Sequence, residues 1–348
     1  MSCEKRRKVS RRTFLRAAGL GTLGLGMTRC MPHVHKEWEV CSAPSSTRPL
    51  VLARSPRVVE VISSKVVNPD NLKLDETVAA RMVRAGLLAL TGATAEAEAW
   101  QAIMPGRLPG ETISFKVNTL NQYAPSSPEI LSGLTASLLG STGIDSGEVF
   151  VWDRTLSELE SRGLTADRLQ VACRGTYVSF KDKTGPGYED QSVCLSGKKI
   201  HFAKLLTRDT RHLINVAILK NHMAAGFTGC MKNHYGSFCR PGDFHQGCEQ
   251  HIALLNTFPQ IVDVSRLCVM DALIAVASGD TDARPDAAPG RLLLSFDPVA
   301  IDQRGLEIRD EFRAQRQLKP GLKAGYLEEA ERLGLGTTRY ELVTIEEP

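Results

Sequence analysis

The stretch LINVAIL, Leu213–Leu219, is followed at once by Lys220, Asn221 and His222. A short apolar run that ends in charged and polar residues is typical of a strand buried on both faces, as in a parallel sheet. The pattern therefore predicts a strand over 213–219 whose carboxyl end carries the lysine and the histidine. Since parallel strands are joined by crossover helices, this stretch also favours an α/β fold.

The rest of the chain continues this alternation of strands and helices. Apolar runs predict further strands over 58–62, 113–118, 148–152, 267–270, 292–296 and 340–345. Amphipathic spacing and capping residues predict helices over 75–90, 129–139, 249–255, 298 to about 315, and 326–333. Between 164 and 211, short β-like pieces surround a Gly-Pro-Gly turn, and we expect a small β-hairpin insertion rather than a βαβ unit. The expected fold is a mostly parallel open sheet flanked by helices, in Rossmann-like layers, forming one domain over 58–348.

The N-terminus has the features of an export signal. The sequence SRRTFL at 10–15 matches a twin-arginine signal, and a short Gly-rich apolar stretch follows it. We interpret 1–35 as the signal region and 36–57 as a linker. The apolar stretch is too short to be a spanning helix, but an uncleaved leader would still be compatible with membrane anchoring. The alternative is a basic arm that binds nucleic acid.

The distribution of charge favours export over nucleic-acid binding. The chain has 43 Lys and Arg against 39 Asp and Glu, a net charge of +4. Residues 1–35 hold eight basic and one acidic residue, so the remainder has a net charge of −3. A nucleic-acid binder is expected to have a basic face on its folded part. We therefore expect a periplasmic or otherwise exported protein that is carried, folded, by the twin-arginine translocation machinery, a route common for proteins with cofactors.

Metal-ligating side chains are crowded between 220 and 251. This segment holds three of the nine cysteines and four of the eight histidines of the chain. Cys230, Cys239, Cys248 and His245 form a candidate shell for iron, zinc or an iron–sulfur cluster, since thiolate and imidazole ligands suit these centres. Their spacing is not a recognised ligand pattern, and one disulfide plus a free thiol is the alternative. The export route favours the metal slightly.

Two lysines flank a glycine-rich turn in the same segment. Lys220 and Lys232 suit an anionic group such as a carboxylate or a phosphate. A lysine in a partly buried pocket beside another cation can have a lowered pKa and act as a base or nucleophile. We expect Lys220, His222 and Lys232 to be catalytic, with His222 as general base or metal ligand. The alternative is a pair of surface lysines on a polar loop.

Polar residues also follow the other predicted strands, at the edge where open α/β sheets bind ligands. These residues are Lys116, Asn118, Asp153, Asp271 and Asp297. Asp297 is expected to cap the next helix, and Asp302, one turn later, to face the crevice. Taken singly, each aspartate is more simply a cap or an ion-pair partner. Together the three are candidates for binding a hard cation or orienting the lysines.

These motifs, in this order, resemble a known family, the domain of unknown function 362. The matching stretches are FKVN at 115–118, Lys220-x-His222 to Thr228, Lys232-Asn233-x-x-Gly236, His245, VMDA at 269–272, SFDPVAID at 295–302 and GLG at 334–336. The resemblance covers about 58–345 and implies an α/β fold but little chemistry, because the family is named for its missing function. The three cysteines are not part of it, and a redox role does not carry over from members with a fused ferredoxin-like domain.

Three functions are consistent with these patterns. The first is an exported enzyme, with a metal or iron–sulfur centre, that acts on an anionic small molecule, with redox chemistry slightly favoured over hydrolysis. Its substrate-binding residues would be Lys116, Asn118, Thr228, Asn233, Asp271, Asp297 and Asp302. The second is a non-catalytic exported protein, braced by disulfides, that binds an anionic ligand or a metal. The third is an accessory factor for another exported enzyme.

Overall fold

The computed structural model describes residues 56–177 and 186–346. The signal region at 1–35 and almost all of the proposed linker lie outside these residues. In the described ranges, no helix combines the length and the apolar character needed to cross a membrane.

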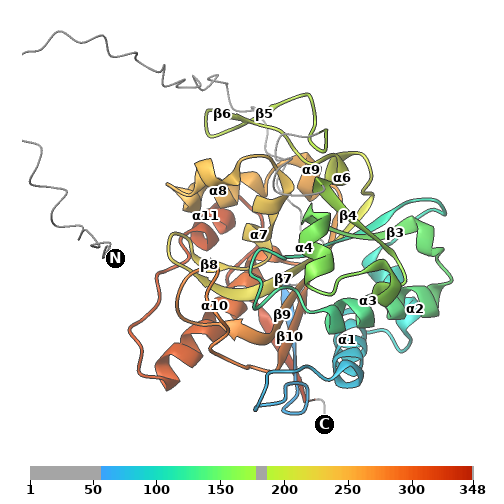
Figure 1. Ribbon diagram of the computed structural model, residues 1–348, viewed down its shortest axis with the longest axis horizontal. Coiled ribbons are helices and arrows are strands. Elements are labelled where there is room, and N and C mark those ends of the chain that lie inside the picture. Colours follow the sequence, from blue (N-terminus) through green and yellow to red (C-terminus); the bar gives the residue numbers. More distant parts are fainter. Residues whose placement is uncertain (1–55, 178–185, 347–348) are drawn as a thin grey trace, which may run out of the picture. The chain divides into compact units, whose positions relative to one another are not determined.

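Within the described residues, a nine-stranded sheet forms the centre of the fold (Figure 1). In spatial order its strands are β11 (Glu341–Glu346), β1 (Arg57–Ile62), β10 (Arg291–Ser295), β9 (Ser265–Val276), β7 (His212–His222), β2 (Ile113–Lys116), β3 (Val149–Thr155) and β4 (Ala172–Tyr177), and β8 (Gly226–Thr228) pairs with the end of β7. Strands β9, β7, β2, β3 and β4 are mutually parallel, whereas β10 is antiparallel to both of its neighbours. The expected α/β fold with a mostly parallel sheet is confirmed.

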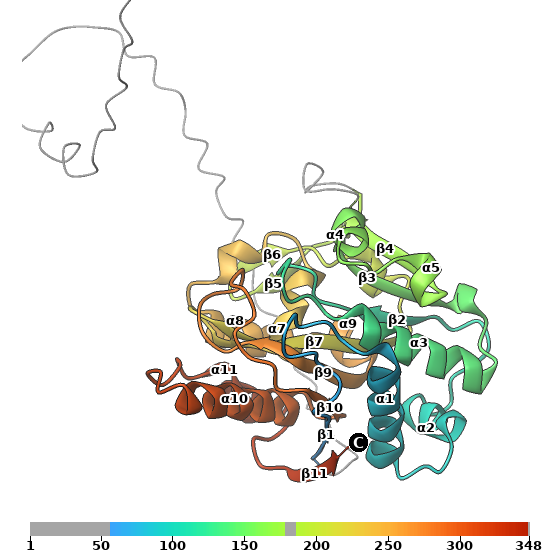
Figure 2. The same cartoon turned by 60° about the horizontal axis from the view of Figure 1, so that its bottom comes forward.

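Helices cover both faces of the sheet (Figure 2). One face is covered by α1 (Glu76–Thr91), α2 (Glu96–Ile103) and α3 (Pro128–Thr142), and the other by α8 (Cys248–Leu255), α10 (Pro298–Gln315) and α11 (Tyr326–Arg332). Each face has its own apolar cluster. Along β7, Leu213 and Ala217 belong to one cluster and Ile214 and Val216 to the other, because successive side chains of a strand point to opposite faces. Burial on both faces explains the apolar run.

Aspartates begin two of the long helices, as their sequence positions suggested. Asp75 accepts a hydrogen bond from the backbone N–H of Val78 at the start of α1. Asp297 accepts from the backbone N–H groups of Val299 and Ala300 at the start of α10. Ser127 occupies the cap position of α3, but its hydroxyl makes no capping bond to that helix.

Between 164 and 211 the structure differs from the expectation. The short helices α4 (Leu156–Ser161) and α5 (Ala166–Leu169) lead into β4, which pairs in parallel with β3, so this part is a βαβ unit. The hairpin is smaller and consists of β5 (Val193–Leu195) and β6 (Lys198–Ile200), followed by α6 (Lys204–Thr207). Helices of four to six residues are too short to show an apolar period, so the pattern concealed them.

The order in which the chain adds strands reverses between β2 and β7. From β2 the chain continues to β3 and β4 on one side, and from β7 to β9 and β10 on the other. The two strands are parallel neighbours, with Lys116 opposite Asn215, so their carboxyl ends open at the same edge of the sheet. In open α/β sheets, ligands bind at such a switch point.

Candidate functional site

A pocket of ≈ 330 Å³ lies at this switch point, and we call it the switch-point pocket. Eight of the predicted site residues line it: Lys116, Asn118, Lys220, His222, Thr228, Lys232, Asn233 and His245. Its other lining residues are Leu120, Asp153, Arg154, Tyr235, Gly236, Pro241, Gly242 and Thr281. The three predicted catalytic residues and four of the seven predicted substrate-binding residues are therefore brought together.

Lys116 forms a buried ion pair at the floor of the pocket. Its Nζ lies 2.7 Å from Oδ1 of Asp153, and both side chains are almost completely buried. Oδ2 of Asp153 accepts from the backbone N–H and the hydroxyl of Thr119. Burial opposes the charge of Asp153, but Lys116 and these donors lower its pKa, so we take the pair to be ionised. A Cβ on Gly236 would lie 2.9 Å from Nζ of Lys116, which explains the glycine in the motif.

Lys220 and Lys232 are the second and third lysines of the pocket, and both are buried. Burial and then the positive charges of Lys232 and Arg154 lower the pKa of Lys220 to about 7. Burial lowers the pKa of Lys232 to about 8, and its ammonium lies 4.1 Å from the ring centroid of Tyr235. Near neutral pH, a large share of Lys220 is therefore an uncharged amine, the form that acts as a base or nucleophile.

Three polar atoms of the pocket are buried without a hydrogen-bond partner in the part of the chain that the structure describes. They are Nζ of Lys220, Oγ1 of Thr228 and Oδ1 of Asn118. Lys220 and Thr228 are directly opposite each other in the β7–β8 pair. Asn118 is held by its amide, which donates to Oδ1 of Asn233 at 3.1 Å. Since buried polar atoms are nearly always paired, these three mark a place where a ligand or ordered water supplies the partners.

Asn233 connects the pocket to the sheet. Its amide donates to Oδ1 of Asn215 at 2.8 Å and to the carbonyl of Lys116 at 3.3 Å. The short helix α7 (Cys230–Asn233), which carries Lys232 and Asn233, is thereby held over β7 and β2. Asn233 therefore positions the pocket wall as well as lining it.

His222 and His245 stack in the pocket with their ring centroids 5.4 Å apart. Nδ1 of His222 accepts from the backbone N–H groups of Ala224 and Ala225, so the network assigns the proton of the neutral ring to Nε2. Burial and then the charge of Lys232 lower the pKa of His222 to about 3. These contacts suit a hydrogen-bond donor better than the general base we expected. Nδ1 of His245 lies 3.3 Å from the carbonyl of Gly242, which leaves Nε2 of that ring as an acceptor.

The three predicted aspartates do not line the switch-point pocket. Asp297 follows β10, which is antiparallel to β9, so it lies at the opposite edge of the sheet from the lysines. Asp271 is inside β9, which continues to Val276, and its carboxylate accepts from Ser127. Both aspartates follow apolar runs, so the sequence suggested that they lie at strand ends near the lysines. The antiparallel direction of β10 places Asp297 at the other edge of the sheet, and the length of β9 places Asp271 inside that strand.

Asp302 has a structural role next to the pocket wall. Its carboxylate accepts from the backbone N–H groups of Cys230 and Met231, at the start of α7, and from the hydroxyl of Tyr326. A Cβ on Gly229 would lie 2.2 Å from its Oδ1, so glycine at this position allows the close approach of Asp302. Asp302 thus fixes the helix that carries Lys232, without reaching the pocket itself.

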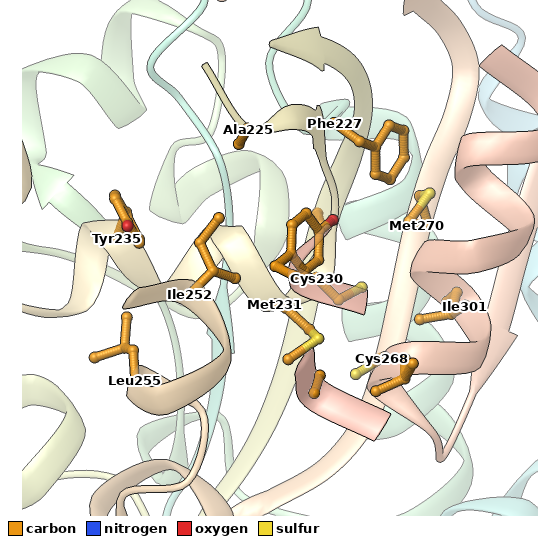
Figure 3. Close-up of a cluster of buried hydrophobic side chains, with 14 of the residues drawn as sticks. Ala225, Phe227, Cys230, Met231, Tyr235, Ile252, Leu255, Cys268, Met270 and Ile301 are labelled. Carbon is orange, nitrogen blue, oxygen red and sulfur yellow. The ribbon is translucent and has the colours of Figure 1, made fainter. Parts of the chain in front are cut away.

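The structure does not bring the predicted metal shell together. Cys230 is packed into the apolar cluster of α7, α8 and β9, near Met231 and Cys268 (Figure 3). Cys230, Cys239 and Cys248 are all free thiols, so the disulfides considered among them are not formed. Across 56–177 and 186–346, no group of three or more His, Cys, Asp or Glu side chains is arranged to hold a metal ion.

Among the residues at the pocket that the predicted site did not include, four have charged or aromatic side chains. Asp153, Arg154 and Tyr235 line it, and Asp280 accepts from the backbone N–H of Met223 at 3.2 Å beside His222. Asp153 stood at a predicted strand end, and Tyr235 lies inside the Lys232 motif, so both had a signal in the sequence. Asp280 lies in a polar loop after β9, and nothing in its neighbours marked it.

The family model described as "Domain of unknown function (DUF362)" matches residues 113–307, which include all the lining residues of the pocket. The chain belongs to the DUF362 family. No curated protein matches this DUF362 chain. A structural genomics crystal structure from Thermotoga maritima is similar at 12% identity and a TM-score of 0.40, covering 70% of this chain. The match spans 59% of the Thermotoga chain.

Proposed function

We propose that this DUF362 protein is an enzyme that binds an anionic small molecule in the switch-point pocket and uses Lys220 as an uncharged amine. The observation that carries the proposal is the Nζ of Lys220, which is buried, has no hydrogen-bond partner within residues 56–177 and 186–346, and lies near a second buried lysine. A site that only binds anions works best with protonated lysines, and burial works against that state. A poised amine therefore favours catalysis over simple binding.

The other pocket residues take complementary roles in this proposal. Lys232 supplies the positive charge that holds the anionic group. Thr228 and Asn118 offer one hydroxyl and one carbonyl oxygen to orient the rest of the molecule. His222 can donate a hydrogen bond from its Nε2–H. Lys116 donates to Asp153 and does not contact the bound molecule in this proposal.

Anion binding should weaken as the pH rises from 7 to 9. A bound anion favours the protonated lysines, so binding takes up protons in the range above the free pKa values of about 7 and about 8. For each proton that binding takes up, the affinity falls about tenfold with each unit by which the pH rises. Calorimetric titration with lactate and with sulfate, neither of which titrates in this range, measures the effect.

The matched variants are Lys232→Met and Lys73→Met. Lys232→Met should weaken lactate binding and reduce the proton uptake, whereas Lys73→Met, at an exposed lysine far from the pocket in sequence, should change neither. A dissociation constant that stays the same between pH 7 and 9, or no binding of either anion, contradicts the proposal.

Metal or iron–sulfur dependence and redox chemistry remain predictions from the crowding of cysteines in the sequence. Within the described residues, the pocket does not contain a group of side chains arranged to hold a metal ion. Elemental analysis of protein produced with its own leader and purified without oxygen is the direct measurement. Stoichiometric iron or zinc would support the prediction, and its absence from fully folded protein would contradict it.

We also propose export by the twin-arginine route, on the basis of the leader sequence. Cys194 is disulfide-bonded, and disulfides persist mainly in oxidising compartments, which is consistent with an exported protein. Replacing Arg11 and Arg12 together by lysine should retain the protein in the cytoplasm, as measured by cell fractionation. Unchanged export of this variant would overturn the proposal.

A further inference from the structure

Within the described residues, Lys220 lacks the hydrogen-bonded carboxylate that a lysine with only a charge-pairing role would have. Two carboxylates, Asp153 and Asp280, act on the charge of Lys220 and favour its protonated form. Asp153 is already paired with Lys116 at 2.7 Å. The other, Asp280, accepts from backbone N–H groups. Within the described residues, Nζ of Lys220 has no hydrogen bond at all, although its side chain is 1% exposed. The amine is thus held in a pocket without a hydrogen-bond partner among the described residues, and burial favours its uncharged form, whose lone pair can act as a nucleophile.

We propose that Lys220 forms a Schiff base with a small carbonyl compound that carries one anionic group. This inference rests on the proposed function, because the anionic group is the one held by Lys232. The pocket volume of ≈ 330 Å³ suits a small molecule. Thr228, opposite Lys220 across the β7–β8 pair, is placed to donate its hydroxyl hydrogen to the carbonyl oxygen of such a substrate.

The step needs no oxidant or reductant. The lone pair of Nζ forms a bond to the carbonyl carbon, the C=O π electrons move to oxygen, and one proton passes from nitrogen to oxygen to give a carbinolamine. The C–O bond then breaks, and the oxygen leaves as water with the second proton from nitrogen. The products are one imine and one water molecule, so both hydrogens lost by the amine end in the water.

The oxygen of Asn118 fits the intermediate better than the substrate. Oδ1 of Asn118 is an acceptor without a donor in the described structure, and a carbonyl group offers it no hydrogen. The carbinolamine hydroxyl does offer one. A group that gains its partner only as the reaction proceeds stabilises the later species selectively, which is what catalysis requires.

Reductive trapping tests the proposal on the full chain. The protein is incubated with pyruvate, or with glycolaldehyde phosphate, in the presence of cyanoborohydride, and the adduct is located by peptide mass spectrometry. We expect one adduct per chain, on Lys220, formed at least tenfold faster than on any other lysine. Lys220→Arg should form no adduct, because it has no primary amine at this position, and the exposed-lysine variant Lys73→Met should behave as the wild type.

The outcomes separate this inference from the proposed function. If lactate binds as expected but neither carbonyl compound is trapped on Lys220, the Schiff base is overturned and the anion site stands. If lactate does not bind, the proposed function fails. Adducts spread over exposed lysines at equal rates in the wild type and in Lys220→Arg would also overturn the Schiff base. Circular dichroism of Lys220→Arg confirms that lost trapping is not lost folding.

Discussion

Replacement of Lys220 by methionine should stabilise the protein and, at the same time, weaken its binding of anions. Methionine has a similar length and no charge, so it fills the space of a buried amine that has no hydrogen-bond partner in the described part of the chain. Leaving a buried polar group unsatisfied costs about 1–3 kcal/mol, and we expect the free energy of unfolding at pH 7 to rise by that amount. Urea unfolding measures it. Loss of a charged hydrogen bond should weaken lactate binding about 10- to 100-fold.

The stability gain should depend on pH in a defined direction. The pKa of Lys220 is about 7 in the folded protein, against about 10.4 for a lysine in an unfolded chain. Between these values the unfolded chain binds a proton at residue 220 that the folded protein lacks, so the wild type gains stability as the pH rises. The advantage of Lys220→Met is therefore largest at pH 7 and shrinks toward pH 10.

The difference in the free energy of unfolding between the wild type and Lys220→Met reports on Lys220 alone, because both proteins have the same charged neighbours. These neighbours are Lys232, Arg154, Asp153 and Asp280. Lys73→Met, at an exposed position, should change stability by less than about 0.5 kcal/mol at every pH. A Lys220→Met protein that is less stable than the wild type at pH 7 would show that the amine has a stabilising partner, and the proposed poised amine would be wrong.

The grouping of the pocket residues was largely predictable, because several of them lie at the ends of strands that run in one direction. Lys116 is the last residue of β2 and Lys220 lies near the end of β7, and parallel neighbours bring their carboxyl ends to one edge. An apolar run shows where a strand lies but not its direction. The antiparallel direction of β10 therefore separates Asp297 from the lysines that it was expected to join.

Sequence proximity was misleading for the cysteines. Cys230, Cys239 and Cys248 lie within 19 residues of one another, but a four-residue α-helix and two short 3₁₀ helices lie along this stretch, and within the described residues the three are not part of any metal-ligand group. Cys230 enters the apolar core, and Cys248 donates its thiol hydrogen to the carbonyl of Ala224. Elements this short have no hydrophobic period, so no pattern in the sequence reveals where their side chains point.

Replacement of Lys116 by methionine should destabilise the protein strongly, in contrast to Lys220→Met. The change leaves the carboxylate of Asp153 buried and without its cation, and breaking a buried pair by removing one partner costs about 3–5 kcal/mol. The hydrogen bonds from Thr119 remain, but they do not neutralise the charge. Urea unfolding at pH 7 measures the loss. Arg332→Met, which breaks an exposed pair with Glu329, should cost only about 0–1 kcal/mol.

The pH dependence and a double variant show whether the isolated charge is the cause. Without Lys116, burial raises the pKa of Asp153 above its unfolded value of about 3.9, so the variant loses stability as the pH rises through that window. The penalty should therefore be smaller at pH 4 than at pH 7. Lys116→Met combined with Asp153→Leu should recover much of the loss, because no buried charge is left. A double variant as unstable as the sum of both single changes would mean that shape, rather than charge, holds the pocket floor together.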